Sequence, residues 1–196
     1  MRSTDKKYFI PIPEGDNELH DEGVVAFEDN APYAKYYSAR VEAGVRRCVI
    51  DSAASGLHYL GYSSLARTLF SANHDQRKDT CGKEFFRDCI LNSTSKEEKK
   101  KFYVVNYTKR KKKEWDILHD SQEYLLCLLG IHSSDGKTDH AVTIVGDWIF
   151  DSNCERALRL SKESLDICSS SYCRDSHFVK PTRGYMLKKR EVIAQK

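Results

Sequence analysis

Residues 140–153 read HAVTIVGDWIFDSN, two short runs of strand-forming residues that are joined by Gly146 and Asp147. A glycine-first pair of turn residues between two such runs is typical of a β-hairpin with a two-residue loop. The turn fixes the register, because Val145 must then pair with Trp148. The sequence therefore predicts an antiparallel hairpin centred on this turn.

In this register, polar residues gather on one side of the hairpin. Directly opposed residues share a face, and so do alternate residues along a strand, which places His140, Asp151 and Asn153 together. Opposed Cβ atoms lie about 5 Å apart and diagonal ones about 7 Å, within reach of an imidazole. A histidine beside an acid or amide is what a catalytic base requires, although a hydrogen-bonded surface histidine would give the same pattern. The opposite side is predicted to face the core and carries Ala141, Thr143, Val145, Trp148 and Phe150.

The second candidate for chemistry is Cys48. Apolar residues follow it at helical spacing, which predicts a helix that begins at this cysteine and ends before Gly61. The N-terminus of a helix and the preceding Arg46 and Arg47 favour a thiolate over a thiol. Backbone N–H groups at the same helix start could bind an oxyanion. The alternative is that Cys48 is a small buried side chain in the first turn.

The periodicity changes once along the chain, from helical spacing to strand spacing. Helices are expected first and antiparallel strands afterwards, which predicts an α+β domain. Further helices are expected at 63–70, at 83–90 and from Ser95, and strands at 102–107, 124–131, 140–145, 148–152 and 178–187. Residues 1–32 carry eight acids against three bases and are expected to form an extended acidic arm. A single domain over 33–190 and a tail at 191–196 complete the chain.

The chain has 196 residues and a formal net charge of +3, which suits one domain and does not by itself indicate nucleic-acid binding. The seven cysteines are an odd number, which favours reduced thiols over a disulfide framework. Of these, Cys89 and Cys127 are expected in the core. No apolar run has the length of a signal-peptide core or a membrane span. We therefore expect an intracellular protein, cytoplasmic or nuclear, without membrane contact.

The order of these features resembles the papain-like cysteine peptidase superfamily. In that superfamily the nucleophile begins the central helix, and the histidine and its Asp or Asn partner lie on neighbouring strands. The sequence WIFDSN at 148–153 resembles the aromatic-Asp-x-Asn element of its bacterial effector proteases and bacteriocin-processing peptidases. The resemblance covers about residues 40–155. It implies a papain-like α+β fold, with N-terminal helices and a nucleophile-bearing central helix packed on a C-terminal antiparallel sheet.

The resemblance also implies roles for individual residues. Cys48 would be the nucleophile, His140 the general base and Asp151 the group that orients the imidazole, with Asn153 as its rival. The implied reaction is hydrolysis of a peptide or isopeptide bond through an acyl-enzyme, without a cofactor. The superfamily usually places a Gln or Asn shortly before the cysteine, but residues 40–47 contain neither. Backbone groups or a residue elsewhere would take that role, or the domain is an inactive binding module.

A strongly basic segment offers a different function. Residues 96–113 contain nine bases and two acids, and five of the bases are consecutive. With Tyr103, Tyr107 and Trp115 nearby, the segment could bind single-stranded nucleic acid or an acidic partner, or it could be a solvated loop between strands. The consecutive bases are Lys109, Arg110, Lys111, Lys112 and Lys113.

A few residues near the C-terminus have the types needed for a structural zinc site, but the pattern does not favour one. Cys168, Cys173 and His177 have the spacing C-x4-C-x3-H and could be joined by Cys154. The chain has no C-x2-C element, and these residues lie in a Ser-rich segment that is interpreted as a loop. The prediction is therefore of a protein without a bound metal.

Overall fold

The computed structural model describes residues 7–9, 24–36, 48–71, 102–106, 124–134, 139–172 and 176–189. The expected helices at 83–90 and after Ser95 lie outside the described residues, as do the basic run 109–113 and the thiols of Cys81, Cys89 and Cys173. None of the helices in the described ranges has the length and apolar content of a membrane-spanning segment.

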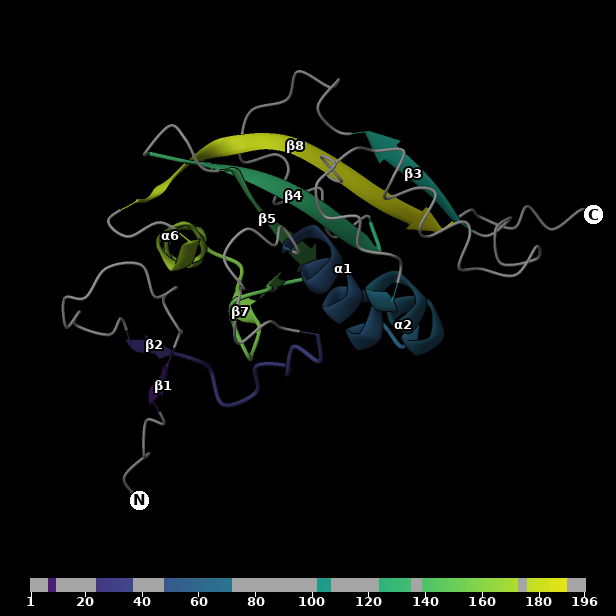
Figure 1. Cartoon of the computed structure of the whole chain (residues 1–196), viewed down its shortest axis with the longest axis horizontal. Helices are drawn as coiled ribbons and strands as arrows, with labels where there is room; N and C mark the ends of the chain where they lie inside the picture. Colours follow the sequence, from purple (N-terminus) through teal and green to yellow (C-terminus); the bar gives the residue numbers. More distant parts are fainter. Residues whose placement is uncertain are drawn as a thin grey trace, which may run out of the picture.

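A six-stranded antiparallel sheet forms the centre of the molecule (Figure 1). Its strand order is β3-β8-β4-β5-β6-β7. The strands are β3 (Phe102–Asn106), β4 (Leu126–Ser133), β5 (Asp139–Val145), β6 (Trp148–Asp151), β7 (Leu158–Arg159) and β8 (Phe178–Lys189). With the helices described below, this confirms the predicted α+β class.

The hairpin of β5 and β6 has the predicted register. Val145 pairs with Trp148 and Val142 with Asp151, which is the last pair of this ladder. Gly146 has φ of 55°, a backbone conformation that suits glycine at the first position of the turn. His140 precedes Val142 by two residues, so it lies beyond the paired part of the hairpin.

Two helices, α1 (Cys48–Tyr59) and α2 (Ser63–Ser71), pack on one face of the sheet. Between them, Gly61 has φ of 86°, the left-handed conformation that ends a helix and favours glycine. Both helices match the predicted spacing closely. They form one core cluster with the predicted apolar side of the hairpin, which we call the α1 face: Ala141, Thr143, Val145, Trp148 and Phe150.

Small residues let α1 approach the sheet closely. A Cβ atom placed on Gly56 would lie 2.8 Å from Cγ2 of Thr143 and 3.1 Å from side-chain atoms of Leu126 and Val145. Ala53 and Ala54 are fully buried beside it. The absence of a side chain at position 56 therefore sets how near the Cys48-bearing helix comes to β5.

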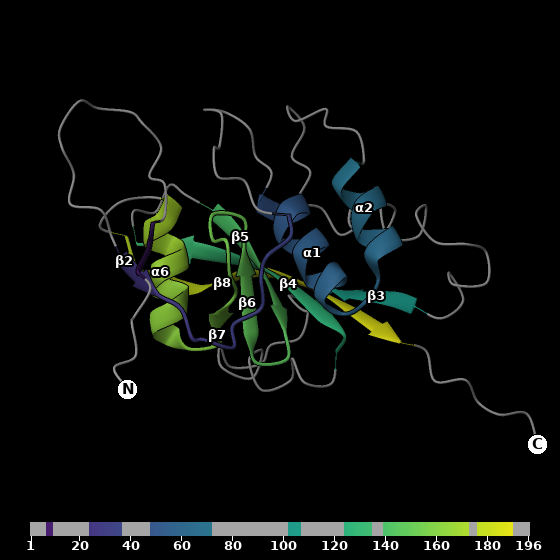
Figure 2. The ribbon, with the colours of Figure 1, turned by 90° about the horizontal axis from the view of Figure 1, so that it is seen from below.

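A third helix, α6 (Lys162–Tyr172), covers the opposite face of the sheet. This corrects the interpretation of the Ser-rich segment as a loop. Ser161 caps the helix, because its Oγ accepts a hydrogen bond from the backbone N–H of Ser164 at 3.0 Å. Figure 2 shows α6 and α1 on opposite sides of the β5–β6 hairpin. The hairpin residues on this second side, the α6 face, are Val142, Ile144, Ile149 and Asp151.

Part of the acidic arm is tied to the loop that follows β6. Strands β1 (Lys7–Phe9) and β2 (Val24–Ala26) pair with each other. Further along, the side chain of Arg156 donates hydrogen bonds to the carbonyl oxygens of Ala31 and Asp29. Ala31 is buried in the core cluster of the α1 face. The last residues of the arm thus brace the loop immediately after Asn153.

Candidate active site

Cys48 is the first residue of α1, and its side chain is partly exposed. The first turn of the helix is fixed to the sheet by two hydroxyl groups. Ser52 donates a hydrogen bond from Oγ to the carbonyl oxygen of Cys48 at 2.6 Å, and Thr143 of β5 donates to Oγ of Ser52 at 3.1 Å. Sequence reasoning missed both hydroxyls, since the burial that makes Ser52 and Thr143 connect α1 with β5 is a tertiary feature.

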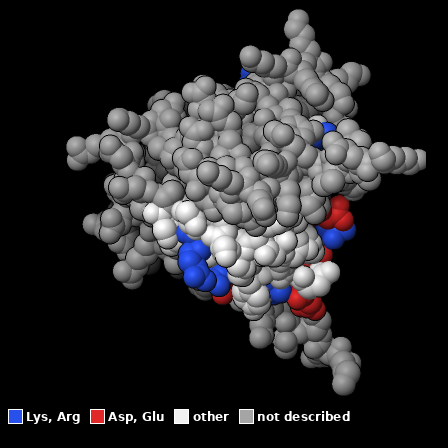
Figure 3. Space-filling model, turned by 90° about the vertical axis from the view of Figure 1, so that its right-hand side faces the viewer, with Lys and Arg blue, Asp and Glu red and all other residues white. Residues whose placement is uncertain are grey.

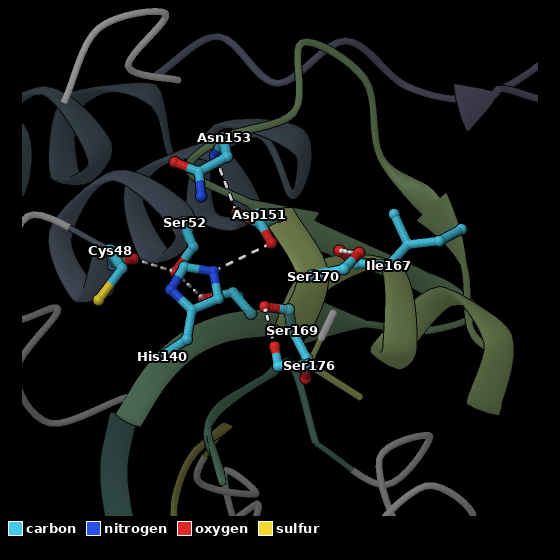
Figure 4. Close-up of polar contacts among 10 residues, drawn as sticks. Cys48, Ser52, His140, Asp151, Asn153, Ile167, Ser169, Ser170 and Ser176 are labelled. Carbon is cyan, nitrogen blue, oxygen red and sulfur yellow. Dashed lines mark hydrogen bonds and ion pairs between the residues drawn. The ribbon is translucent and has the colours of Figure 1, made fainter. Parts of the chain in front are cut away.

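His140 is buried, and its ring lies between two of its predicted partners, Asp151 and Cys48. Its Nε2 lies 3.0 Å from Oδ2 of Asp151, and both side chains are 0% exposed. This excludes the interpretation of His140 as a surface histidine beside a turn. Figure 4 shows the second ring nitrogen on the side of Cys48, and the Cys48 thiol is near enough to contribute to the raised pKa of His140.

Burial alone would lower the pKa of His140, but charge and hydrogen bonding outweigh it. The Asp151 carboxylate contributes most, Cys48 adds to it, and together they raise the pKa of His140 to about 10. Conversely, burial would raise the pKa of Asp151, and the charge and hydrogen bond of His140 hold it below the ordinary value. The arrangement therefore favours an imidazolium next to the sulfur at neutral pH.

Asp151 and Asn153 occupy different places in this arrangement. Asp151 supplies the carboxylate oxygen that contacts the imidazole, whereas the backbone N–H of Asn153 donates to Oδ1 of Asp151 at 2.8 Å. Asn153 thus supports the carboxylate through its main chain (Figure 4). The structure brings together all four residues that the sequence singled out, with Asp151 as the hydrogen-bond partner of His140.

Three further thiols in the described ranges are buried, and their environments differ from that of Cys48. Burial raises the pKa of Cys127 to about 12, as expected of a core thiol. Burial and the charge of Asp151 raise the pKa of both Cys154 and Cys168 well above the ordinary value. These thiols stay protonated at neutral pH, and Cys48 is the partly exposed cysteine among the described residues.

Within the described ranges, no three His, Cys, Asp or Glu side chains are grouped so as to hold a metal ion. Two of the four candidate zinc ligands, Cys154 and Cys168, lie beside Asp151 in the core of the α6 face. A third candidate, His177, is exposed. The remaining one, Cys173, lies outside the described residues.

Two other sequence features lie mostly outside the described residues. Residues 40–47, where the superfamily usually has its oxyanion-binding Gln or Asn, lie outside the described ranges, and so do most residues of the basic segment 96–113. On the side of the molecule shown in Figure 3, the described surface carries both basic and acidic side chains among uncharged ones.

Comparison with known proteins gives no relative for this chain: no family model matches it, no curated protein does, and no solved structure does. A functional interpretation therefore depends on the geometry of the site.

Proposed function

We propose that the protein is a papain-like thiol hydrolase that cleaves peptide or isopeptide bonds. The observation that carries this proposal is the buried, hydrogen-bonded pair of His140 and Asp151 beside the Cys48 thiol at the start of α1. The sulfur is partly exposed, the imidazole lies between it and the buried carboxylate, and this is the order that an activated thiol nucleophile needs.

The first chemical step is attack of the Cys48 thiolate on the substrate carbonyl carbon. An S–C bond forms and the carbonyl oxygen becomes an oxyanion, for which the backbone N–H groups at the start of α1 are the available donors. The imidazolium of His140 then gives its proton to the leaving amine as the C–N bond breaks. The products of this step are the free amine and a thioester on Cys48.

The second step restores the enzyme. His140, now neutral, accepts a proton from water as the water oxygen attacks the thioester carbonyl, and the S–C bond breaks to release a carboxylic acid. Asp151 keeps Nε2 of His140 protonated and aimed, so that the other ring nitrogen faces the sulfur in both steps. The side chains of His140 and Asp151 are 0% exposed, which keeps their ion pair away from bulk water.

The proposal is tested by covalent labelling followed by peptide mapping. The purified full chain is treated with a peptidyl acyloxymethyl ketone, which a thiolate attacks with loss of a carboxylate. We expect an adduct on Cys48, and we expect labelling to fall about 100-fold in His140→Gln. Gln is chosen because its amide can still donate a hydrogen bond to Asp151.

The buried thiols of Cys127, Cys154 and Cys168 are internal controls in the same experiment. Equal, slow labelling of several cysteines in a folded protein would contradict the proposal and support an inactive binding module. Cleavage of a peptide library and of a library linked through lysine side chains then separates peptide from isopeptide specificity.

A further inference from the structure

The carboxylate of Asp151 is held from three directions. The imidazole of His140 contacts Oδ2, the backbone N–H of Asn153 contacts Oδ1, and the buried thiol of Cys168 lies near enough to act as a donor that lowers the pKa of this carboxyl. Of these contacts, the one from Cys168 comes from α6, on the side of the sheet opposite to Cys48. The carboxylate thus lies where the site and the α6 core meet.

Cys168 is well suited to donate to this carboxylate. Its side chain is fully buried, and it packs in one core cluster with Leu165 of the same helix and with Val142 of β5. Burial and the neighbouring charge of Asp151 raise the pKa of Cys168 well above the ordinary value. The sulfur therefore keeps its proton through the neutral range and can act as a donor to Asp151 rather than as a second anion.

We propose that Cys168 is a positioning residue, whose S–H group donates to the Asp151 carboxylate and fixes it in the orientation that accepts the imidazole N–H of His140. Cys168 does not touch the substrate and acts through Asp151. This inference rests on the proposed function, since orienting the His140–Asp151 pair matters only if that pair assists Cys48.

Three replacements of Cys168 should affect the pKa of Asp151 differently. Ala at position 168 removes the donor and leaves a cavity, Val removes the donor but fills most of the volume, and Ser keeps a donor. A carboxylate that accepts two or three hydrogen bonds has a strongly lowered pKa, so the loss of one donor should raise the pKa of Asp151. Packing changes alone would not distinguish Ser from Val in this way.

The test is a pH titration of the Asp151 carboxyl carbon by NMR in the full chain. We expect Cys168→Ala and Cys168→Val to move the protonation midpoint of Asp151 upward by about 0.5–1 pH unit. Cys168→Ser should stay within about 0.3 unit of the wild type, because its hydroxyl replaces the thiol as donor. Cys127→Ala is the matched control, a buried thiol of the same core cluster, and should leave the midpoint unchanged.

Failure of this inference can be distinguished from failure of the proposed function. One outcome refutes only the role of Cys168. In that case the Asp151 midpoint is low in the wild type and His140 remains protonated above pH 8, but the Asp151 midpoint is the same in Cys168→Val as in Cys127→Ala. If His140 already titrates near its ordinary value in the wild type, the ion pair is absent and the proposed function fails with it. Should Ala prevent folding, the Val and Ser variants still decide the question.

Discussion

Helices α1 and α6 cover opposite faces of the same hairpin, and they do so with different kinds of residues. Against the α1 face, α1 presents Ala53, Gly56 and Leu57, which allow close apolar packing. Against the α6 face, α6 presents Leu165 together with the thiol of Cys168, which lies beside Asp151. The packing between α1 and its face is therefore mainly apolar, apart from the hydroxyl contact of Ser52 with Thr143, whereas the other face contains a buried carboxylate.

This difference shows how the two parts of the candidate site are built. The α1 face sets the distance of the nucleophile-bearing helix from the sheet, because nothing larger than a hydrogen atom fits at Gly56. On the α6 face, donors surround the carboxylate of Asp151, so that its charge is tolerated in the interior. His140 lies at the end of the hairpin ladder, where groups from both sides meet.

The largest expected effect tests whether both helices are equal parts of the core. Leu57 of α1 and Leu165 of α6 are each fully buried. Truncation of either to Ala should lower the free energy of unfolding by about 2–5 kcal/mol, from lost apolar burial and the cavity left behind. Urea denaturation of both variants measures this. A cost below about 1 kcal/mol for Leu165→Ala alone would mean that α6 is only loosely attached.

The next effect distinguishes Asp151 from Asn153, the two residues that the sequence left open as the group that orients His140. Asp151→Asn keeps the shape but removes the charge that holds His140 protonated, so labelling of Cys48 should fall about 100-fold. Asn153→Ala retains the backbone N–H that contacts Asp151, so it should change labelling by less than about 5-fold. The reverse ranking of the two variants would assign the orienting role to the Asn153 side chain.

A smaller effect concerns the close approach of α1. In an exposed helix, Gly→Ala is stabilising by up to about 1 kcal/mol. At Gly56 the new methyl group would meet Thr143 and Leu126, so we expect a net loss of about 1–3 kcal/mol in unfolding free energy. Gly61→Ala is the comparison, since its Cβ meets nothing within 4 Å and its cost comes from the positive φ alone. Stabilisation by Gly56→Ala would contradict the close packing.

The last effect is a gradual one, a dependence of stability on pH that comes from the ion pair and is small over any one pH unit. The pKa of His140 is raised from 6.5 to about 10, so the stabilisation from its charge is complete below pH 6.5. It declines as the pH rises and is lost once the pH passes about 10, with a slope of at most about 1.4 kcal/mol per pH unit. The lowered pKa of Asp151 acts in the opposite direction, and its contribution is lost in acid.

Thermal unfolding between pH 6 and pH 10 measures this slope. Asp151→Asn should remove most of it, because the largest attraction on the His140 proton is gone. An equal slope in the wild type and in Asp151→Asn would show that His140 does not form the ion pair.

The part of the site that could be predicted depends on local pattern. Alternation along 140–153 and the Gly146–Asp147 turn were enough to give the hairpin register, and apolar spacing gave the helix that begins at Cys48. Both signals arise within a few residues and need no knowledge of the rest of the fold. The proximity of His140 to Asp151 followed directly from the register.

The part that could not be predicted depends on packing between distant segments. The sequence of α6 is rich in serine and has few apolar residues, so its helical state relies on burial of Leu165 and Cys168 against the sheet. The cap at Ser161 was a usable signal, since the apolar Leu165 and Cys168 follow it at helical spacing. Because the helix was not predicted, the sequence indicated Cys168 only as a candidate metal ligand. Its position beside Asp151 could not be predicted.

The central claim is that Cys48, His140 and Asp151 act as one unit, and the rate of Cys48 alkylation at pH 7 tests it most directly. Iodoacetamide is used with peptide mapping on the wild type and His140→Gln. An unassisted thiol is only a few per cent thiolate at this pH, so stabilisation by the imidazolium should make Cys48 react about 10-fold faster in the wild type. Equal rates in two folded proteins would contradict the account.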